Sequence, residues 1–229
     1  MTAATPPSST GPAEGRTGSV RRAIATRLPL DELLPTRQPD YVHSWAYVFG
    51  AITIAAFVWV VISGVVLAFF GPQWWHHSAV GKFFNSLHFW AVQAFFVFMV
   101  LHLWTQFWAA GWRDGRAPTW VTGMVIFLIS IVTAFTGYIS QQNFDAQWIA
   151  VNAKDAVNAT GVGSFFNPLN FGQAYGIHIM LLPIAVLIVL ISHIALVRMK
   201  GVVRPIGAPP PPRGPADPSE EEAPEVARG

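Results

Sequence analysis

The stretch LHFWAVQAFFVFMVLH, residues 87–102, is an apolar run with a histidine close to each end. His88 and His102 are fourteen positions apart. In an α-helix, fourteen residues turn the chain by roughly 1400°, about 40° short of four full turns, and rise about 21 Å. The two imidazoles therefore share one face of the predicted helix at two separate depths.

Most of the chain is as apolar as this stretch. Of its 229 residues, 52% are apolar and only 11% are charged, which is too hydrophobic for an ordinary soluble domain. A hydrocarbon core of about 30 Å needs about 20 helical residues, and four windows without a charge are long enough to cross it. They span residues 46–70, 83–110, 117–144 and 156–197. We therefore predict an all-α membrane protein with a bundle of four transmembrane helices.

Lysine and arginine are unevenly placed around these windows. Only Lys82 and Lys154 fall on one side of the predicted bundle. By the positive-inside rule that side is the outer one, so both termini are expected to be cytoplasmic in a cytoplasmic-membrane protein. The basic residues on the cytoplasmic side are Arg16, Arg21, Arg22, Arg27, Arg37, Arg113, Arg116, Arg198, Lys200, Arg204, Arg213 and Arg228.

The chain is predicted to have four segments. Residues 1–19 and 204–229 are rich in Pro, Ser, Gly or Glu and are expected to be disordered tails. Residues 20–42 interleave basic and apolar side chains, as an amphipathic segment on the cytoplasmic surface would. Residues 43–203 form the four-helix domain. Within its second outer connection, QWIAVNAKDAV (147–157) is expected to form a short surface helix.

Two more histidines lie in the fourth predicted helix. His178 and His193 are fifteen positions apart, so they rise about 22 Å and are about 60° from full alignment. Because the second and fourth helices run in the same direction, His178 falls at the outer depth of His88. His193 falls at the inner depth of His102. Ionisable groups inside a bilayer are costly, so four of them indicate a function.

The ligand count favours one kind of metal group. Zinc or copper normally needs more than two imidazoles, and the sequence has no cysteine and no intramembrane carboxylate to supply the rest. A haem brings four nitrogens and needs two axial ligands from the protein. We therefore predict two non-covalent b-type haems. Their iron ligands are expected to be His88 and His178 for the outer haem, and His102 and His193 for the inner haem.

Glycines repeat the histidine spacing on the other two helices. Gly50 and Gly64 lie in the first helix and Gly123 and Gly137 in the third, each pair fourteen positions apart. Small residues let membrane helices approach closely. We expect these four glycines to make room for the haems.

These residues together give the sequence a resemblance to a known family. It resembles the cytochrome b family of the quinol:cytochrome c/plastocyanin oxidoreductases, or bc complexes, and most closely the four-helix cytochrome b6 type. The resemblance covers about residues 27–203. It rests on the four histidines, the four glycines, PTWVTG at 118–123, GY at 137–138, Pro183, and the basic pair Arg198 and Lys200.

The resemblance implies a subunit that carries electrons across the membrane and is not catalytic alone. Quinol would be oxidised at an outer site and quinone reduced at an inner site of a respiratory quinol:cytochrome c-type oxidoreductase. Arg116 would face a propionate of the inner haem, and Arg198 would lie near the inner quinone site. The implied partners are a Rieske iron–sulfur protein, a c-type cytochrome and a three-helix chain like subunit IV, in a dimeric complex.

Three departures from the family pattern fall toward the outer side or the first helix. ISQQN, residues 139–143, stands where the family has a Leu-Pro-Trp segment beside the outer quinol pocket. Asn85 and Gln173 stand where the b6 type has arginines facing the outer haem's propionates. Val48 occupies the region of the cysteine that carries an additional haem in b6 proteins. We expect a lowered potential for the outer haem and no cysteine-linked haem.

Two other hypotheses use the same residues. In one, the chain is a dihaem membrane anchor that relays electrons between quinone and a redox module without a Rieske protein. In the other, a haem-free transporter or channel uses the histidines to line a proton or metal path. The outward pair His76 and His77 is expected to be a feature of a loop or an interface.

Overall fold

The computed structural model describes residue 42 and residues 45–205. The predicted tail at 1–19, the amphipathic segment apart from residue 42, and the C-terminal tail from 206 onward lie outside the described residues. Within the described part every regular element is helical. The elements are α3 (Trp45–His77), α4 (Ala79–Trp108), α5 (Ala117–Ile139), α6 (Phe144–Ala159), the 3₁₀ turn η2 (Val162–Ser164), α7 (Phe171–Gly176), the π turn η3 (Ile177–Leu181) and α8 (Leu182–Lys200).

Four of these helical stretches are long and apolar enough to cross a membrane: Ala46–His77, Ala79–Trp108, Ala117–Ile139 and Phe171–Lys200. The last combines α7, η3 and α8. Large apolar side chains such as Trp59, Phe69 and Ile188 are exposed on the outside of the bundle. Such a surface suits lipid rather than water. The prediction of an all-α membrane protein with four transmembrane helices is confirmed.

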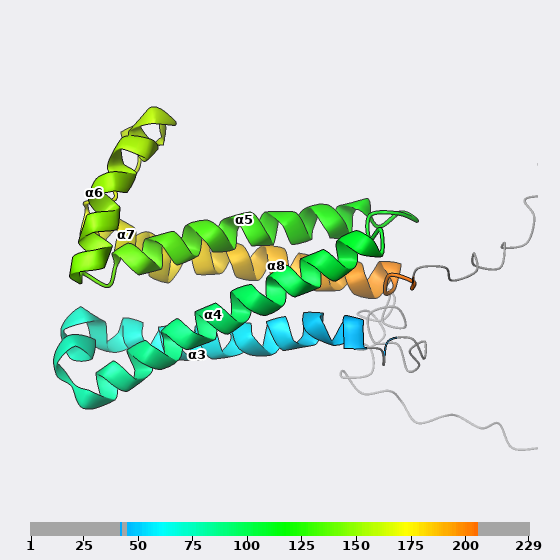
Figure 1. Ribbon diagram of the computed structural model, residues 1–229, viewed down its shortest axis with the longest axis horizontal. Coiled ribbons are helices and arrows are strands. Elements are labelled where there is room, and N and C mark those ends of the chain that lie inside the picture. The colour runs from blue at the N-terminus through cyan, green and yellow to red at the C-terminus, as the bar shows by residue number, and fades with distance from the viewer. Residues whose placement is uncertain (1–41, 43–44, 206–229) are drawn as a thin grey trace, which may run out of the picture.

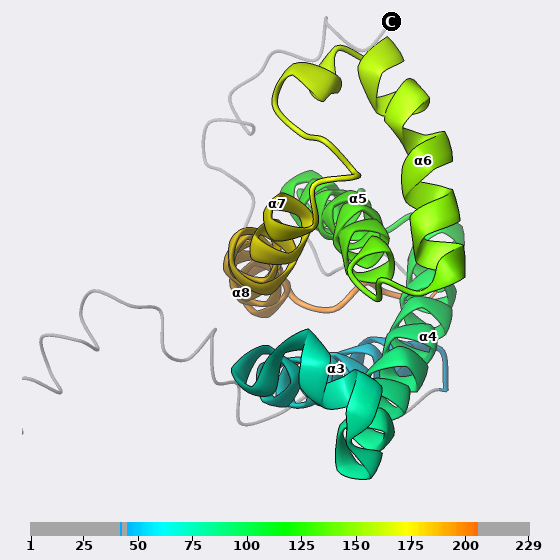
Figure 2. The same cartoon turned by 90° about the vertical axis from the view of Figure 1, so that its left-hand side faces the viewer.

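The four long helices pack as two pairs. Helix α3 lies along α4, and α5 lies along α8, whereas α4 and α5 meet over only a short length (Figures 1 and 2). A buried cluster of Phe95, Met99, Ile126 and Val186 joins the pairs near the middle of the bundle. Phe95 is seven residues from His88 and seven from His102. The apolar cluster therefore separates the outer histidine level from the inner one.

The first outer connection, between the charge-free windows at 46–70 and 83–110, is largely helical. Gly71 adopts φ 75° and ψ 175°, which bends the chain, and Pro72 then begins a second helical stretch that ends at His77. The Ser78 side chain caps α4 by accepting from the backbone N–H of Gly81. A Cβ on Gly81 would overlap the backbone carbonyl oxygen of Trp74. Glycine at this position therefore lets the start of α4 pack against the end of α3, with only Ser78 between the two helices.

The second outer connection contains the predicted surface helix. Helix α6 begins after Asn143, whose side chain accepts from the backbone N–H of Ala146, and it extends away from the bundle axis (Figures 1 and 2). The fourth span begins at Phe171, later than the charge-free window at 156 suggested. The reason is that the first part of that window completes α6 and the turn after it.

Candidate functional site

A cavity of about 280 Å³ lies between the two helix pairs in the outer half of the bundle. Most of its lining is apolar, and none of the described residues that line it is a lysine, arginine, aspartate or glutamate. His88 and His178 line it from α4 and η3, and Gly64 and Gly137 line it from α3 and α5. Its volume is close to the range of about 300–1,000 Å³ typical of small-molecule sites.

The two outer histidines face each other across this space. Their ring centroids are 6.4 Å apart and their planes are at 86°. Two metal–imidazole bonds of about 2 Å, with about 1 Å from each centroid to its nitrogen, also add up to about 6 Å. The spacing of His88 and His178 therefore fits one metal ion held between them.

Hydrogen bonds fix the tautomer of both outer rings. The Nδ1 of His88 is 3.1 Å from the carbonyl oxygen of Val60 and 3.0 Å from Ser63 Oγ. The Nδ1 of His178 is 2.9 Å from the carbonyl oxygen of Thr133. A carbonyl can only accept, so each Nδ1 carries the hydrogen and each Nε2 keeps its lone pair for a metal. Both rings are thus prepared as ligands.

The inner level is built in a similar way, with one difference. The Nδ1 of His193 is 3.0 Å from Thr122 Oγ1, and that hydroxyl donates to the carbonyl oxygen of Thr119 at 2.9 Å. The His193 ring is therefore the donor, and its Nε2 is free. The Nδ1 of His102 is buried and finds no hydrogen-bond partner among the described residues.

Each predicted glycine lies against one histidine ring. The pairs are Gly50 with His102, Gly64 with His88, Gly123 with His193 and Gly137 with His178. A Cβ would stand 3.2 Å from Cε1 of His102, 3.1 Å from Cε1 of His88 and 3.2 Å from Cε1 of His193. At Gly137 it would overlap the ring of His178, with Nε2 at 2.9 Å. The glycines therefore make room for the imidazole rings themselves, and the expectation that they also make room for the haems stays a prediction.

A π turn resolves the odd spacing in the fourth span. His178 lies inside η3 (Ile177–Leu181), and Pro183 follows within the first turn of α8. A π turn takes one residue more than an α turn, and Pro183 has no N–H to donate in the α pattern. Fifteen positions therefore give the same rotation as fourteen do in α4. In a regular α-helix the same spacing would leave the two histidines about 60° out of alignment.

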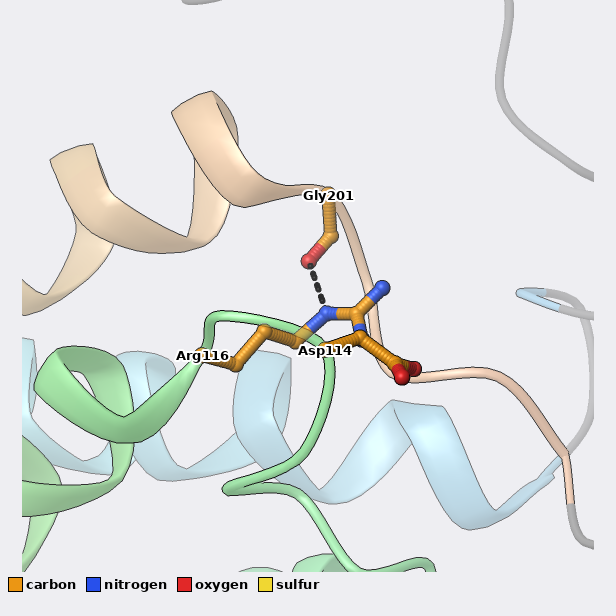
Figure 3. Close-up of polar contacts among 3 residues, drawn as sticks. All are labelled: Asp114, Arg116 and Gly201. Carbon is orange, nitrogen blue, oxygen red and sulfur yellow. Dashed lines mark hydrogen bonds and ion pairs between the residues drawn. The ribbon is translucent and has the colours of Figure 1, made fainter. Parts of the chain in front are cut away.

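The two arginines that the resemblance assigns to the inner haem and the inner quinone site lie at the end of the bundle away from α6. The Nε of Arg116 donates to the carbonyl oxygen of Gly201 at 3.4 Å, and its Nη1 is 3.1 Å from Asp114 Oδ2 (Figure 3). The Arg116 side chain is only 11% exposed. Arg198 is exposed in the last turn of α8. Arg116 therefore ties the turn between α4 and α5 to the end of the fourth span.

Two of the sequence departures form a single structural feature. The Asn85 amide donates to Gln141 Oε1 at 3.0 Å, and the Gln141 amide donates to Asn85 Oδ1 at 3.0 Å. Both side chains line the outer cavity. Gln173 instead faces the loop before α7, where it accepts from the backbone N–H of Asn167 and donates to the carbonyl oxygen of Phe165. Their separation of 56 positions hid the Asn85–Gln141 pair from sequence reasoning.

A haem, the group that the resemblance implies, fits the outer site. The cavity is apolar, its two imidazoles are spaced for one iron, and both offer Nε2. The described residues contain no group of three or more His, Cys, Asp or Glu side chains placed to hold a metal ion.

The fold and the site together define a class of membrane proteins. In this class, histidines from two helix pairs face each other at two depths of the bilayer. The chain belongs to the cytochrome b N-terminal family, because the family model described as "Cytochrome b(N-terminal)/b6/petB" matches residues 93–210.

Named relatives agree with this membership. Cytochrome b6 of Heliomicrobium gestii is 23% identical over 190 residues, which is 73% of this chain and 89% of that protein. Cytochrome b6 of Heterocapsa triquetra is 26% identical over 202 residues, covering 77% and 92%. The cytochrome bc complex cytochrome b subunit of Chlorobaculum thiosulfatiphilum is 25% identical over 199 residues, covering 78% of this chain and 46% of that protein.

A solved structure shares the fold. A chain of a "Hyperthermophilic respiratory Complex III" superposes with a TM-score of 0.63 at 18% identity. The match covers 84% of this chain and 57% of the other. The present chain is therefore similar in fold to little more than half of that subunit.

Proposed function

We propose that the chain is the dihaem cytochrome b subunit of a respiratory quinol:cytochrome c-type oxidoreductase. The observation that carries the proposal is the outer histidine pair: two rings 6.4 Å apart line an apolar cavity in a member of the cytochrome b family. The inner pair, His102 and His193, lies about 21 Å further along the helices, beside its own glycines. The chain would carry electrons across the membrane between an outer quinol-oxidation site and an inner quinone-reduction site.

In this function the protein orients and insulates its cofactors. Bound haem supplies an iron that accepts and releases one electron at a time. The Nδ1–H donors of His88 and His178 hold their rings with Nε2 toward the metal position. Phe95, between the two histidine levels, keeps water out of the space that separates them. We assign Arg116 to the inner haem's propionates and Arg198 to the inner quinone site, at the end of the bundle where both lie.

The proposal includes partners and an orientation. The chain would assemble with a Rieske iron–sulfur protein, a c-type cytochrome and a three-helix chain like subunit IV, as a dimeric complex in the cytoplasmic membrane. Lys82 and Lys154 would face outward and both termini would be cytoplasmic, because the other basic residues flank the opposite helix ends.

Purification of the complex from native membranes tests this function. Two low-spin b-type haems per chain with separate midpoint potentials, copurifying with a Rieske protein and a subunit IV-like chain, would support the proposal. Preparations that contain the folded chain but show no b-type band in a reduced-minus-oxidised spectrum would refute it and favour the transporter hypothesis.

One observation favours a second candidate function. Gln141, in the segment where the sequence departs from the family's outer quinol pocket, is engaged with Asn85 at the cavity wall. A chain with an altered outer wall suits a dihaem anchor that relays electrons between quinone and a redox module without a Rieske protein. Copurification with a dehydrogenase or hydrogenase-like partner and no Rieske protein would select this candidate.

A further inference from the structure

The outer end of the cavity carries a group of four uncharged polar side chains. They are Trp75, Asn85, Gln141 and Tyr175, which we call the outer collar, and all four line the cavity. Asn85 and Tyr175 each precede an outer histidine by three residues. Such an offset places a side chain about 5 Å, or one helical turn, further along the same helix face. The outer collar is therefore a polar layer one turn beyond the histidine level.

Gln141 belongs to the same layer on α5's side of the cavity. It follows Gly137, the glycine that seats the His178 ring, by four residues. Its reciprocal bonds to Asn85, both 3.0 Å, connect the two helix pairs at this level. Each amide group has two N–H donors and uses one in the pair. Among the described residues, one N–H of Asn85 and one of Gln141 have no other partner, so they are available for a ligand.

The other two members of the outer collar also have donors to spare. Trp75 is 4% exposed, and its Nε1 is buried without a hydrogen-bond partner in the part of the chain that the structure covers. The same holds for the hydroxyl of Tyr175, whose ring centroid is 6.3 Å from that of Trp75. A buried donor left unpaired is costly and rare in folded proteins. Both groups therefore call for an acceptor.

The ligand that this layer suits is apolar over most of its surface and carries hydrogen-bond acceptors at one edge. Indole N–H is a donor only, and the free amide hydrogens of Asn85 and Gln141 are donors as well. No cation among the described lining residues accompanies them. A haem presents two carboxylates at one edge of a flat apolar ring, which meets this description.

We propose that the outer collar binds the propionate carboxylates of the outer haem through uncharged donors. This inference rests on the proposed function, because it requires a haem between His88 and His178. The outer collar takes the place of the arginines that the resemblance leads one to expect at Asn85 and Gln173. Gln173 takes no part, since its amide is held by the loop at Phe165 and Asn167.

The inference has an electrochemical consequence. An uncharged collar leaves the negative charge of the propionates without a cation in the cavity lining, since Lys82, one helical turn beyond Asn85, is exposed outside it. The uncompensated negative charge stabilises the oxidised, more positive iron. A cation introduced at the outer collar should therefore raise the midpoint potential of the outer haem. The inner haem should be unaffected, because the Phe95 cluster and about 20 Å of helix separate the two levels.

The test is a redox titration of the purified complex carrying Asn85→Arg, with Ser86→Arg as the matched control. Ser86 is the next residue, exposed and outside the cavity lining, so it places the same charge at nearly the same depth. For Asn85→Arg we expect a roughly tenfold rise in the reduced-to-oxidised ratio of the outer haem at a fixed potential, which is about 59 mV for one electron. Ser86→Arg should give a much smaller rise.

A second variant keeps the inference testable if Asn85→Arg fails to assemble. Asn85→Asp preserves volume, removes a donor and adds a negative charge, so the outer potential should fall and the outer haem should be lost faster in detergent. Asn85→Gln, which restores the donor, should recover haem retention. An outer potential that moves equally in Asn85→Arg and Ser86→Arg, or is unchanged in Asn85→Asp, would overturn the inference. Two b haems in these variants would leave the proposed function intact, whereas wild-type protein without haem would overturn both.

Discussion

The imidazole of His178 lies so close to Gly137 that one added carbon on the glycine would overlap the ring. Of the four glycine–histidine contacts this is the tightest, and it lies beside the π turn in which His178 sits. The position of a proposed iron ligand is thus set by a residue on a different helix.

Gly137→Ala should displace the His178 ring and weaken the outer haem. Overpacking of a tight contact costs about 1–3 kcal/mol, so haem affinity should fall roughly 5- to 150-fold. Haem per polypeptide and the amplitude of the outer signal measure the loss. Gly176→Ala is the control, because nothing lies within 4 Å of a Cβ at that position. Equal haem loss in the two variants would refute the role of Gly137.

His88→Ala should remove the outer haem and leave the inner one. The remaining imidazole, His178, offers a single ligand, while His102 and His193 are unchanged at the other depth. A pyridine haemochrome assay should then give one haem per chain, and a redox titration should lose the lower-potential component. Disappearance of the higher-potential component alone would reverse the assignment of the two levels.

Deletion of Met180 should be tolerated. It removes the extra residue of the π turn, so that His178 and His193 become fourteen apart and stay aligned in a continuous α-helix. Deletion of Val97 from α4 is the matched change, since it lies between two histidines that have no π turn between them. It should rotate His88 and His102 by about 100° relative to each other and remove at least one haem. Both side chains are exposed, at 61% and 55%.

Haem content per chain, measured in membranes, distinguishes the Met180 deletion from the Val97 deletion. Similar loss in both would show that the π turn does not absorb the fifteenth residue.

Ser63→Ala should weaken the hydrogen bonding that holds the His88 ring without changing the ring's tautomer. The Nδ1 loses one acceptor at 3.0 Å and keeps the carbonyl oxygen of Val60 at 3.1 Å. A lost hydrogen bond of about 0.5–1.5 kcal/mol corresponds to a roughly two- to tenfold faster loss of outer haem in detergent. Ser192→Ala provides the control, because the Ser192 side chain is exposed and donates within its own helix to the carbonyl oxygen of Ile188. Faster loss of the outer haem in both variants would point to a general effect of removing a hydroxyl rather than to the hydrogen bond with His88.

The spans and the histidine levels are legible in the sequence because they depend on local periodicity. His88 and His102 share one helix, so their spacing alone predicts a common face. The surface helix α6 follows from composition in the same way, and the structure confirms it. Charge-free windows are less informative at their ends. The bend at Gly71 and the late start at Phe171 depend on backbone dihedrals and on neighbouring elements.

Contacts between distant segments are not legible from one sequence. Asn85 and Gln141 were noted as separate departures, yet their side chains form one reciprocal pair. Likewise, nothing local links Trp75 to Tyr175, although they line the same cavity. The π turn around His178 left one signal, the fifteenth residue between the histidines. That signal has meaning only once the rotation of the helix is compared with that of α4.

The division of the bundle into α3 with α4 and α5 with α8 has a consequence for biogenesis. Each proposed iron takes one ligand from each pair, so a haem is a cross-link between two hairpins that share few direct contacts. Binding that couples to folding stabilises the assembled form by mass action. The supply of haem would then set how much of this subunit reaches the assembled four-helix form. Helix pairs without haem would be the form accessible to membrane proteases.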